Sequence, residues 1–142
     1  MKTRFTILVL SLLLAATAMA ADSTYQPFVL AYINDVGMQE SVTSTTNALE
    51  EAGFEIAGKY KPLGNAVVMV ATHDLLKKAA AASDRGGYAA GQRISVTERG
   101  GKTEVAFINP LYIQYAYRLE TDMQPVLDLL SKTLGNVEFY GA

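Results

Sequence analysis

Hydrophobic residues fall along the chain in short runs that predict β-strands. Residues 28–33 and 66–71 are apolar throughout, which is typical of strands covered on both faces. Residues 54–61 alternate between apolar and polar positions instead, which predicts a strand with one face toward solvent. The side chains expected to share its inner face are Phe54, Ile56, Gly58 and Tyr60.

Two glycines mark a hairpin in the second half of the chain. Residues 93–97 and 103–107 both alternate cleanly, and Gly100-Gly101 lies between them. Glycine supplies the positive φ angles that a tight hairpin turn requires. The tail at residues 137–140 either pairs as an edge strand or packs loosely.

Four helices are predicted from apolar spacing and capping residues. The first carries Val42, Thr45, Leu49 and Ala52 on one face and ends at Gly53. The second spans residues 75–82, with Thr72 as its N-cap.

The third and fourth predicted helices lie close together near the C-terminus. Asn109-Pro110 is a favourable start for a short helix over residues 111–118, because asparagine caps and proline lacks an amide hydrogen that would be unpaired there. Thr121 and Gln124 have the spacing of a capping box for the last helix. That helix would present Val126, Leu127, Leu130 and Leu134 and end at Gly135.

The element order is therefore β-α-β-β-α-β-β-α-α. We expect an α+β fold in which the first six elements form a ferredoxin-like arrangement, with an antiparallel or mixed sheet, helices packed on one face, and an extra hairpin and C-terminal helices. Since no linker or repeat divides the chain, residues 21–142 should form a single domain.

Residues 1–20 have the three parts of a secretory signal peptide. Lys2 and Arg4 are basic, residues 5–16 are almost wholly apolar, and Ala18-Met19-Ala20 offers small residues at a cleavage site. The apolar run is shorter than the roughly 20 residues that a membrane span needs. We expect cleavage after Ala20, a periplasmic or secreted mature protein, and no membrane association afterwards.

Composition narrows the classes of function. Half of the residues are hydrophobic, the formal net charge is −2, and there is no cysteine. Without a basic field the chain is not expected to bind nucleic acid. Without cysteine it has no disulfide, thiolate metal site or cysteine nucleophile.

Several stretches in order resemble the small bacterial and archaeal domain-of-unknown-function family three-zero-two. They are residues 48–54, residues 91–96, and Asn109-Pro110-Leu111-Tyr112 leading to Ala116-Tyr117-Arg118. The resemblance spans roughly residues 40–135. It implies a compact α+β fold that dimerises through its sheet, and it implies no reaction.

The candidate ligand-binding residues are Arg93, Asn109, Tyr112 and Tyr115. Tyr112 and Tyr115 share one helix face and could form an aromatic wall, whereas Tyr117 turns away. The alternative is that these tyrosines are half-buried between helix and sheet. Arg93 could clamp an anion, although pairing with Glu104 across the hairpin is the expectation we favour.

Metal and catalytic chemistry have little support in the sequence. His73 is the single histidine, and it could be a base, a metal ligand or a haem ligand, yet it lacks partners at ligand spacing. Met69 is expected to fill the core. The glycines at 86–91 lack the residues of a phosphate loop, and no arrangement indicates an enzyme.

The sequence therefore predicts an exported domain that acts by binding, through self-association as a homodimer or through a small ligand or protein partner. The alternatives are a metal or haem carrier using His73 and an enzyme of unknown class. The sequence names no cofactor.

Overall fold

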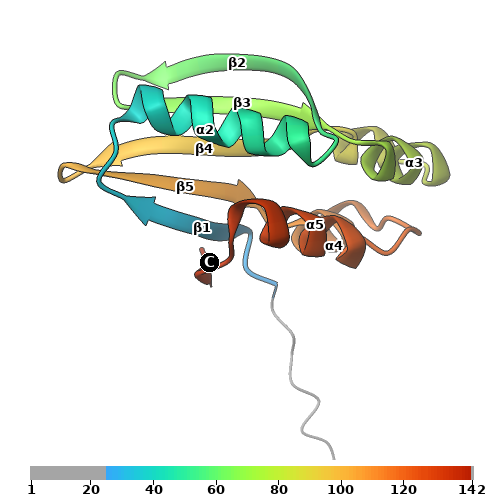
Figure 1. Ribbon diagram of the computed structural model, residues 1–142. Helices are drawn as coiled ribbons and strands as arrows, with labels where there is room; N and C mark the ends of the chain where they lie inside the picture. The colour runs from blue at the N-terminus through green and yellow to red at the C-terminus, as the bar shows by residue number, and fades with distance from the viewer. Residues whose placement is uncertain (1–24, 142) are drawn as a thin grey trace, which may run out of the picture.

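The computed structural model describes residues 25–141, which form one sheet with helices packed against it (Figure 1). The predicted signal peptide lies outside the described residues. In chain order the elements are β1 (Phe28–Asn34), α2 (Met38–Glu51), β2 (Glu55–Leu63), β3 (Ala66–Thr72), α3 (Asp74–Ala82), the 3-10 turn η1 (Gly86–Ala89), β4 (Gln92–Arg99), β5 (Lys102–Ile108), α4 (Pro110–Tyr117), α5 (Gln124–Leu134) and β6 (Glu138–Tyr140).

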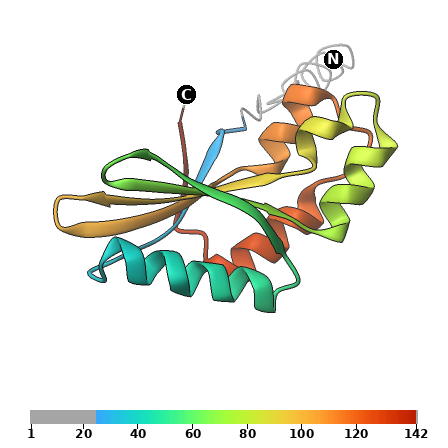
Figure 2. The same ribbon diagram turned by 90° about the horizontal axis from the view of Figure 1, so that it is seen from above.

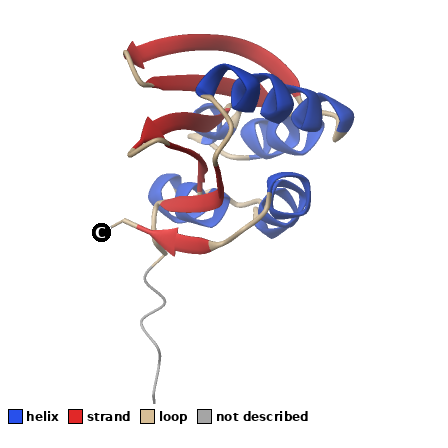
Figure 3. Ribbon diagram, turned by 60° about the vertical axis from the view of Figure 1, so that its left-hand side comes forward, coloured by secondary structure: helices blue, strands red, loops and turns tan. Residues whose placement is uncertain are grey.

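The six strands form one antiparallel sheet in the order β2-β3-β4-β5-β1-β6. The predicted α+β class is thereby confirmed, and the C-terminal tail pairs as an edge strand on β1. Figure 3 shows the strands stacked in this order, with the C-terminus beside the β6 edge.

The strand order differs from a ferredoxin-like sheet, in which β1 would lie directly beside β3. Here the β4–β5 hairpin separates them. From β1 to β2 the sheet passes through four antiparallel pairings, so these two strands run parallel to each other. The helix α2, which connects them, therefore crosses the sheet and contacts β2, β3, β4 and β5. The position of the β4–β5 hairpin between β3 and β1 depends on pairing between strands far apart in the sequence. The order of elements along the chain does not specify this pairing.

One face of the sheet carries the hydrophobic core. Met69, Ile94, Phe107 and Val29 are cross-strand neighbours on this face, and all four are at most 1% exposed. Figure 2 shows α2 and α5 side by side along it, while α3, η1 and α4 gather beyond one end of the strands. Burial of these apolar surfaces, at about 25 cal/mol per Å², provides the main stabilising term.

The opposite face has no helix packed along its centre. We call it the open face; its central residues are Val68, Ser95, Ala106 and Leu30, which are also cross-strand neighbours. The expectation that β1 and β3 are covered on both faces is therefore wrong for this face. Val68 and Val70 remain partly exposed, and Phe28 is 41% exposed.

The predicted alternation of β2 is also wrong in its second half. A register shift between Ile56 and Gly58 places two residues of β2 against one step of β3. Side chains beyond such a bulge change face. Ile56 accordingly lies beside the core, whereas Tyr60 pairs with Val68 and joins the open face.

Two helix starts differ from the predicted caps. The N-cap of α3 is His73 rather than Thr72, whose hydroxyl instead donates to the carbonyl of Ala90. The last helix begins at Gln124 with Met123 as its N-cap, so the predicted N-cap Thr121 lies two residues too early. Its first amides are satisfied by Asp122 and by the Gln114 side chain of α4, so tertiary contact replaces the local cap.

Within the described residues, no helix combines the length and apolar character needed to cross a bilayer.

Candidate functional site

A hollow of about 170 Å³ lies in the open face. Residues of β1, β2, β3, β4 and β5 line it. Its lining residues are Phe28, Tyr60, Val68, Arg93, Ser95, Ala106, Phe107 and Ile108. The hollow is therefore apolar, with one cation on its wall.

Arg93 is exposed on the open face and points away from the core, as its strand alternation predicted. The predicted pairing with Glu104 is wrong, because Glu104 lies opposite Thr97. Thr97 lies four residue steps along the strand from Arg93, which corresponds to about 13 Å. Among the described residues, no carboxylate lies within ion-pair distance of Arg93.

An aromatic pair closes the β1–β6 side of the open face. Phe28 and Tyr140 are cross-strand neighbours, and their ring centroids are 5.4 Å apart. Burial raises the pKa of Tyr140 above its ordinary value, and the negative charges of Glu104 and Glu138 raise it further, while Arg99 lowers it.

Asn109 is a structural residue in this fold. Its side chain is 1% exposed, its Oδ1 accepts from the backbone N–H of Leu111 at 3.0 Å, and its Nδ2 donates to the carbonyl of Gln26 at 2.9 Å. These bonds cap α4 and attach the segment before β1 to it. Both ends of the amide therefore hold backbone groups, and Asn109 also lines a depression with Tyr25, Gln26, Leu111 and Phe139.

Tyr112 and Tyr115 line a second, shallower depression together with Tyr25 and Ala116. The rings of Tyr25 and Tyr115 stack with centroids 4.4 Å apart, and the side-chain hydrogen bond with Tyr25 raises the pKa of Tyr115. Tyr117 turns away and stacks on Tyr88 of η1. Tyr112 and Tyr115 thus share a face and Tyr117 does not, as helical spacing predicts, and the aromatic surface that they form includes Tyr25 and does not include Arg93.

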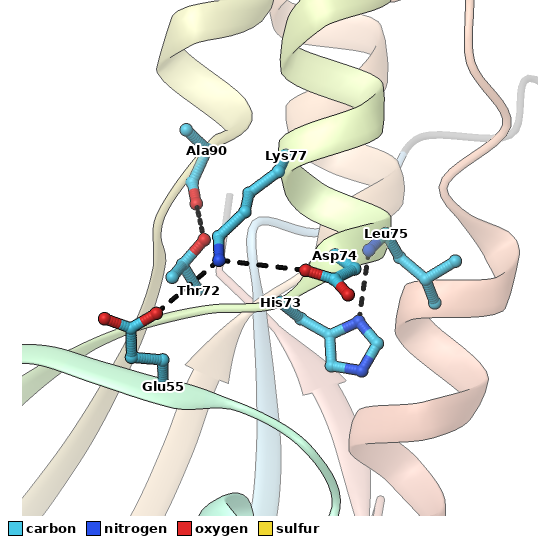
Figure 4. Close-up of polar contacts among 7 residues, drawn as sticks. All are labelled: Glu55, Thr72, His73, Asp74, Leu75, Lys77 and Ala90. Atoms are coloured by element: carbon cyan, nitrogen blue, oxygen red, sulfur yellow. Dashed lines mark hydrogen bonds and ion pairs between the residues drawn. The ribbon is translucent and has the colours of Figure 1, made fainter.

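His73 acts locally as a helix cap (Figure 4). Its Nδ1 accepts a hydrogen bond from the backbone N–H of Leu75 at 3.1 Å, and its ring lies against Phe54 with centroids 4.9 Å apart. In the part of the chain that the structure describes, no three His, Asp or Glu side chains gather as a metal-binding group. Met69 fills the core with no exposure.

The sequence pattern identified one residue of the hollow, Arg93, and missed most of its apolar wall. The wall residues Phe28 and Val68 belong to the two continuous apolar runs. These runs predict strands buried on both faces, and they do not distinguish burial within the chain from a partly exposed binding surface. Tyr60 had no signal, because the bulge that turns it outward is not visible as a pattern.

Comparison with known proteins adds a likeness of fold. No family model matches the chain, and no curated protein sequence matches it either. One solved structure that matches is the crystal structure of an uncharacterized conserved protein DUF302 from Bacillus stearothermophilus. It has a TM-score of 0.62 and 14% sequence identity, over 72% of this chain and 94% of that chain. At the level of fold, this match confirms the resemblance to family three-zero-two that the sequence motifs indicated.

Proposed function

We propose that this protein is an exported binding domain that self-associates through the open face of its sheet. One observation carries the proposal: β1 and β3 have the apolar composition of strands covered on both faces, yet Phe28, Val68 and Val70 remain partly exposed on the open face. Large exposed apolar patches on a stable domain mark interaction sites. A second copy of the same face would supply the missing cover.

The charges on the open face suit pairing with itself. Arg93 lies near one end of the strands, and Glu104, two strand positions beyond Ala106, lies toward the other. In a two-fold symmetric dimer the same patch is presented by both subunits. An antiparallel arrangement would then place the arginines of the two copies at opposite ends of the interface, where they do not repel each other.

Association through the sheet edges is less favourable. The β2 edge carries Lys59, Lys61 and Pro62 and has two register shifts, and β6 at the other edge is only 3 residues long. Charged residues, proline, bulges and short strands all oppose edge-to-edge pairing. The face, rather than either edge, is therefore the surface available for a second copy.

Export is proposed from the leader pattern. All of the described helices and strands lie after Ala20, so cleavage there would remove none of them. Mass measurement of protein purified from its native compartment should give a chain that begins at Ala21. A chain that retains Met1 would contradict the proposed export.

Sedimentation velocity at micromolar concentration tests the self-association. We expect the wild-type protein to sediment as a dimer and Val68→Lys as a monomer, because the substitution places a lysine at the centre of the open face. Circular dichroism should show that the variant is still folded. Leu75→Lys on α3 is the matched control, since Leu75 is an exposed apolar residue that belongs to a helix and not to the open face. A monomeric wild-type protein, or a dimer that Val68→Lys leaves intact, would contradict the proposal.

A further inference from the structure

The hollow in the open face combines a hydrocarbon wall with one unpaired cation. Phe28, Val68, Ala106 and Ile108 supply the apolar surface, and Arg93 is the only charged side chain among its lining residues. The hydroxyl of Ser95 donates to the carbonyl of Ala106 at 3.4 Å. The guanidinium of Arg93 is therefore the charged donor on the wall, beside the neutral hydroxyl donor of Tyr60.

The size of the hollow restricts the ligand. Its volume of about 170 Å³ is close to that of an apolar cavity of about 150 Å³ that takes up benzene in another protein. A single aromatic ring or a short alkyl chain would fit, and a nucleotide or a haem would not.

The charge of the hollow indicates which end of the ligand is polar. Arg93 presents a planar fork of N–H donors that matches a carboxylate in a bidentate geometry. No acidic side chain lines the hollow, so a bound anion would meet no like charge there. An apolar hollow with one arginine suits a ligand that has one negative group and a hydrocarbon body.

We propose that the hollow binds a small apolar monocarboxylate, with the carboxylate on Arg93 and the hydrocarbon among Phe28, Val68 and Ile108. The inference rests on the open face being a binding surface, as proposed above. It adds the chemical class of the ligand, and it assigns Arg93 a role in recognition rather than in an ion pair within the hairpin.

Isothermal titration of the mature protein with benzoate tests the inference, with benzyl alcohol and inorganic phosphate as comparison probes. We expect benzoate to bind more tightly than either, because only benzoate has both the ring and the carboxylate. Arg93→Gln should weaken benzoate binding about tenfold or more, as loss of a charge-assisted hydrogen bond predicts, and should leave the weak binding of benzyl alcohol unchanged.

Arg85→Gln is the matched control, because Arg85 is an exposed arginine in the loop before η1 and does not line the hollow. It should bind benzoate like the wild type. Val68→Phe, which places a ring in the hollow, should weaken both benzoate and benzyl alcohol. Absence of benzoate binding, equal affinity for phosphate, or unchanged affinity in Arg93→Gln would overturn the inference.

The same samples separate this inference from the proposed self-association. A dimer by sedimentation that does not bind benzoate would contradict the ligand class and leave the dimer proposal standing. A monomer that binds benzoate through Arg93 would contradict self-association and support the ligand class.

Discussion

The Nδ1 atom of His73 accepts a hydrogen bond from the backbone N–H of Leu75 at 3.1 Å, so the single histidine of the chain caps α3. The ring is also positioned by Phe54, with the centroids 4.9 Å apart. Accepting this bond requires Nδ1 to be unprotonated. The histidine therefore has a defined structural role that does not depend on any ligand.

Replacing His73 tests whether the cap accounts for its importance. His73→Ala should lower the free energy of unfolding by about 1 kcal/mol, because an N-cap acceptor is lost. His73→Asn should retain most of the stability, since asparagine is a favourable N-cap. Urea unfolding of both variants gives the comparison, and equal losses in the two variants would show that the cap contributes little.

The His73→Asn variant also separates the cap from a metal or haem role. It keeps an acceptor for the Leu75 amide but removes the imidazole. If protein purified from its native compartment carried metal or haem on His73, the wild type would show the bound species and His73→Asn would not. Metal analysis and visible absorbance measure this difference directly.

Gly86 is required by close backbone packing. A Cβ built at this position would lie 2.1 Å from the carbonyl oxygen of Ala80, whereas one at the neighbouring Gly87 meets nothing within 4 Å. Gly86→Ala should destabilise the protein by ~1–3 kcal/mol, as overpacking does, and Gly87→Ala should change stability by less than about 0.5 kcal/mol. Thermal unfolding of the pair checks this; a Gly86→Ala protein as stable as Gly87→Ala would refute it.

Asn109 should be important for stability, because its side chain holds two backbone segments together. Asn109→Ala removes the cap of α4 and leaves the partly buried N–H of Leu111 and the carbonyl of Gln26 without this partner, which should cost about 1–2 kcal/mol. Asn136→Ala is the control, because that side chain makes one long, exposed hydrogen bond to Ser131. Chemical denaturation should show a clear loss for the first variant and a negligible change for the second.

The raised pKa of Tyr140 leads us to expect a loss of stability at alkaline pH. Its raised pKa means that the folded state holds the phenol proton more tightly than the unfolded state. The contribution is fully present below the ordinary tyrosine pKa of about 10, and it is lost as the pH rises through the higher folded-state pKa. The free energy of unfolding of Tyr140→Phe should therefore fall less steeply than that of the wild type as the pH rises above about 10. Unfolding followed by circular dichroism at several pH values measures this difference.

The charges beside Tyr140 provide a second measurement. Glu104→Gln removes a negative charge that raises the pKa of Tyr140, so the tyrosinate absorbance should develop at lower pH than in the wild type. Burial still raises the pKa in this variant, so the return toward the ordinary value should be partial. No change in the titration would contradict the assigned cause.

Local signals predicted most of the elements. The β4–β5 hairpin forms around Gly100 and Gly101, which have φ values of +58° and +76°, and Asn109 caps α4 as expected. In each case the conformational requirement belongs to a few adjacent residues, so the residue types are sufficient. The capping box at Thr121 failed because Gln114, nine residues before Met123, supplies an acceptor from another helix.

The candidate site was only partly predictable for the same reason. Arg93 was found because strand alternation places it off the core face. Its neighbours in the hollow come from five strands, and Tyr60 joins them only through the bulge at Ile56–Gly58. Sequence periodicity describes one strand at a time and does not state which strands adjoin.

The sequence by itself determined the secondary structure elements, the α+β class and the absence of thiol chemistry, since these follow from residue type and spacing. Only the tertiary structure decided that the β4–β5 hairpin lies between β3 and β1 and that one apolar sheet face is left without helices along it. Strand pairing depends on contacts between segments far apart in the chain. A continuous apolar run indicates that both faces of a strand are apolar. Only the fold shows which of these faces is packed against helices of the same chain.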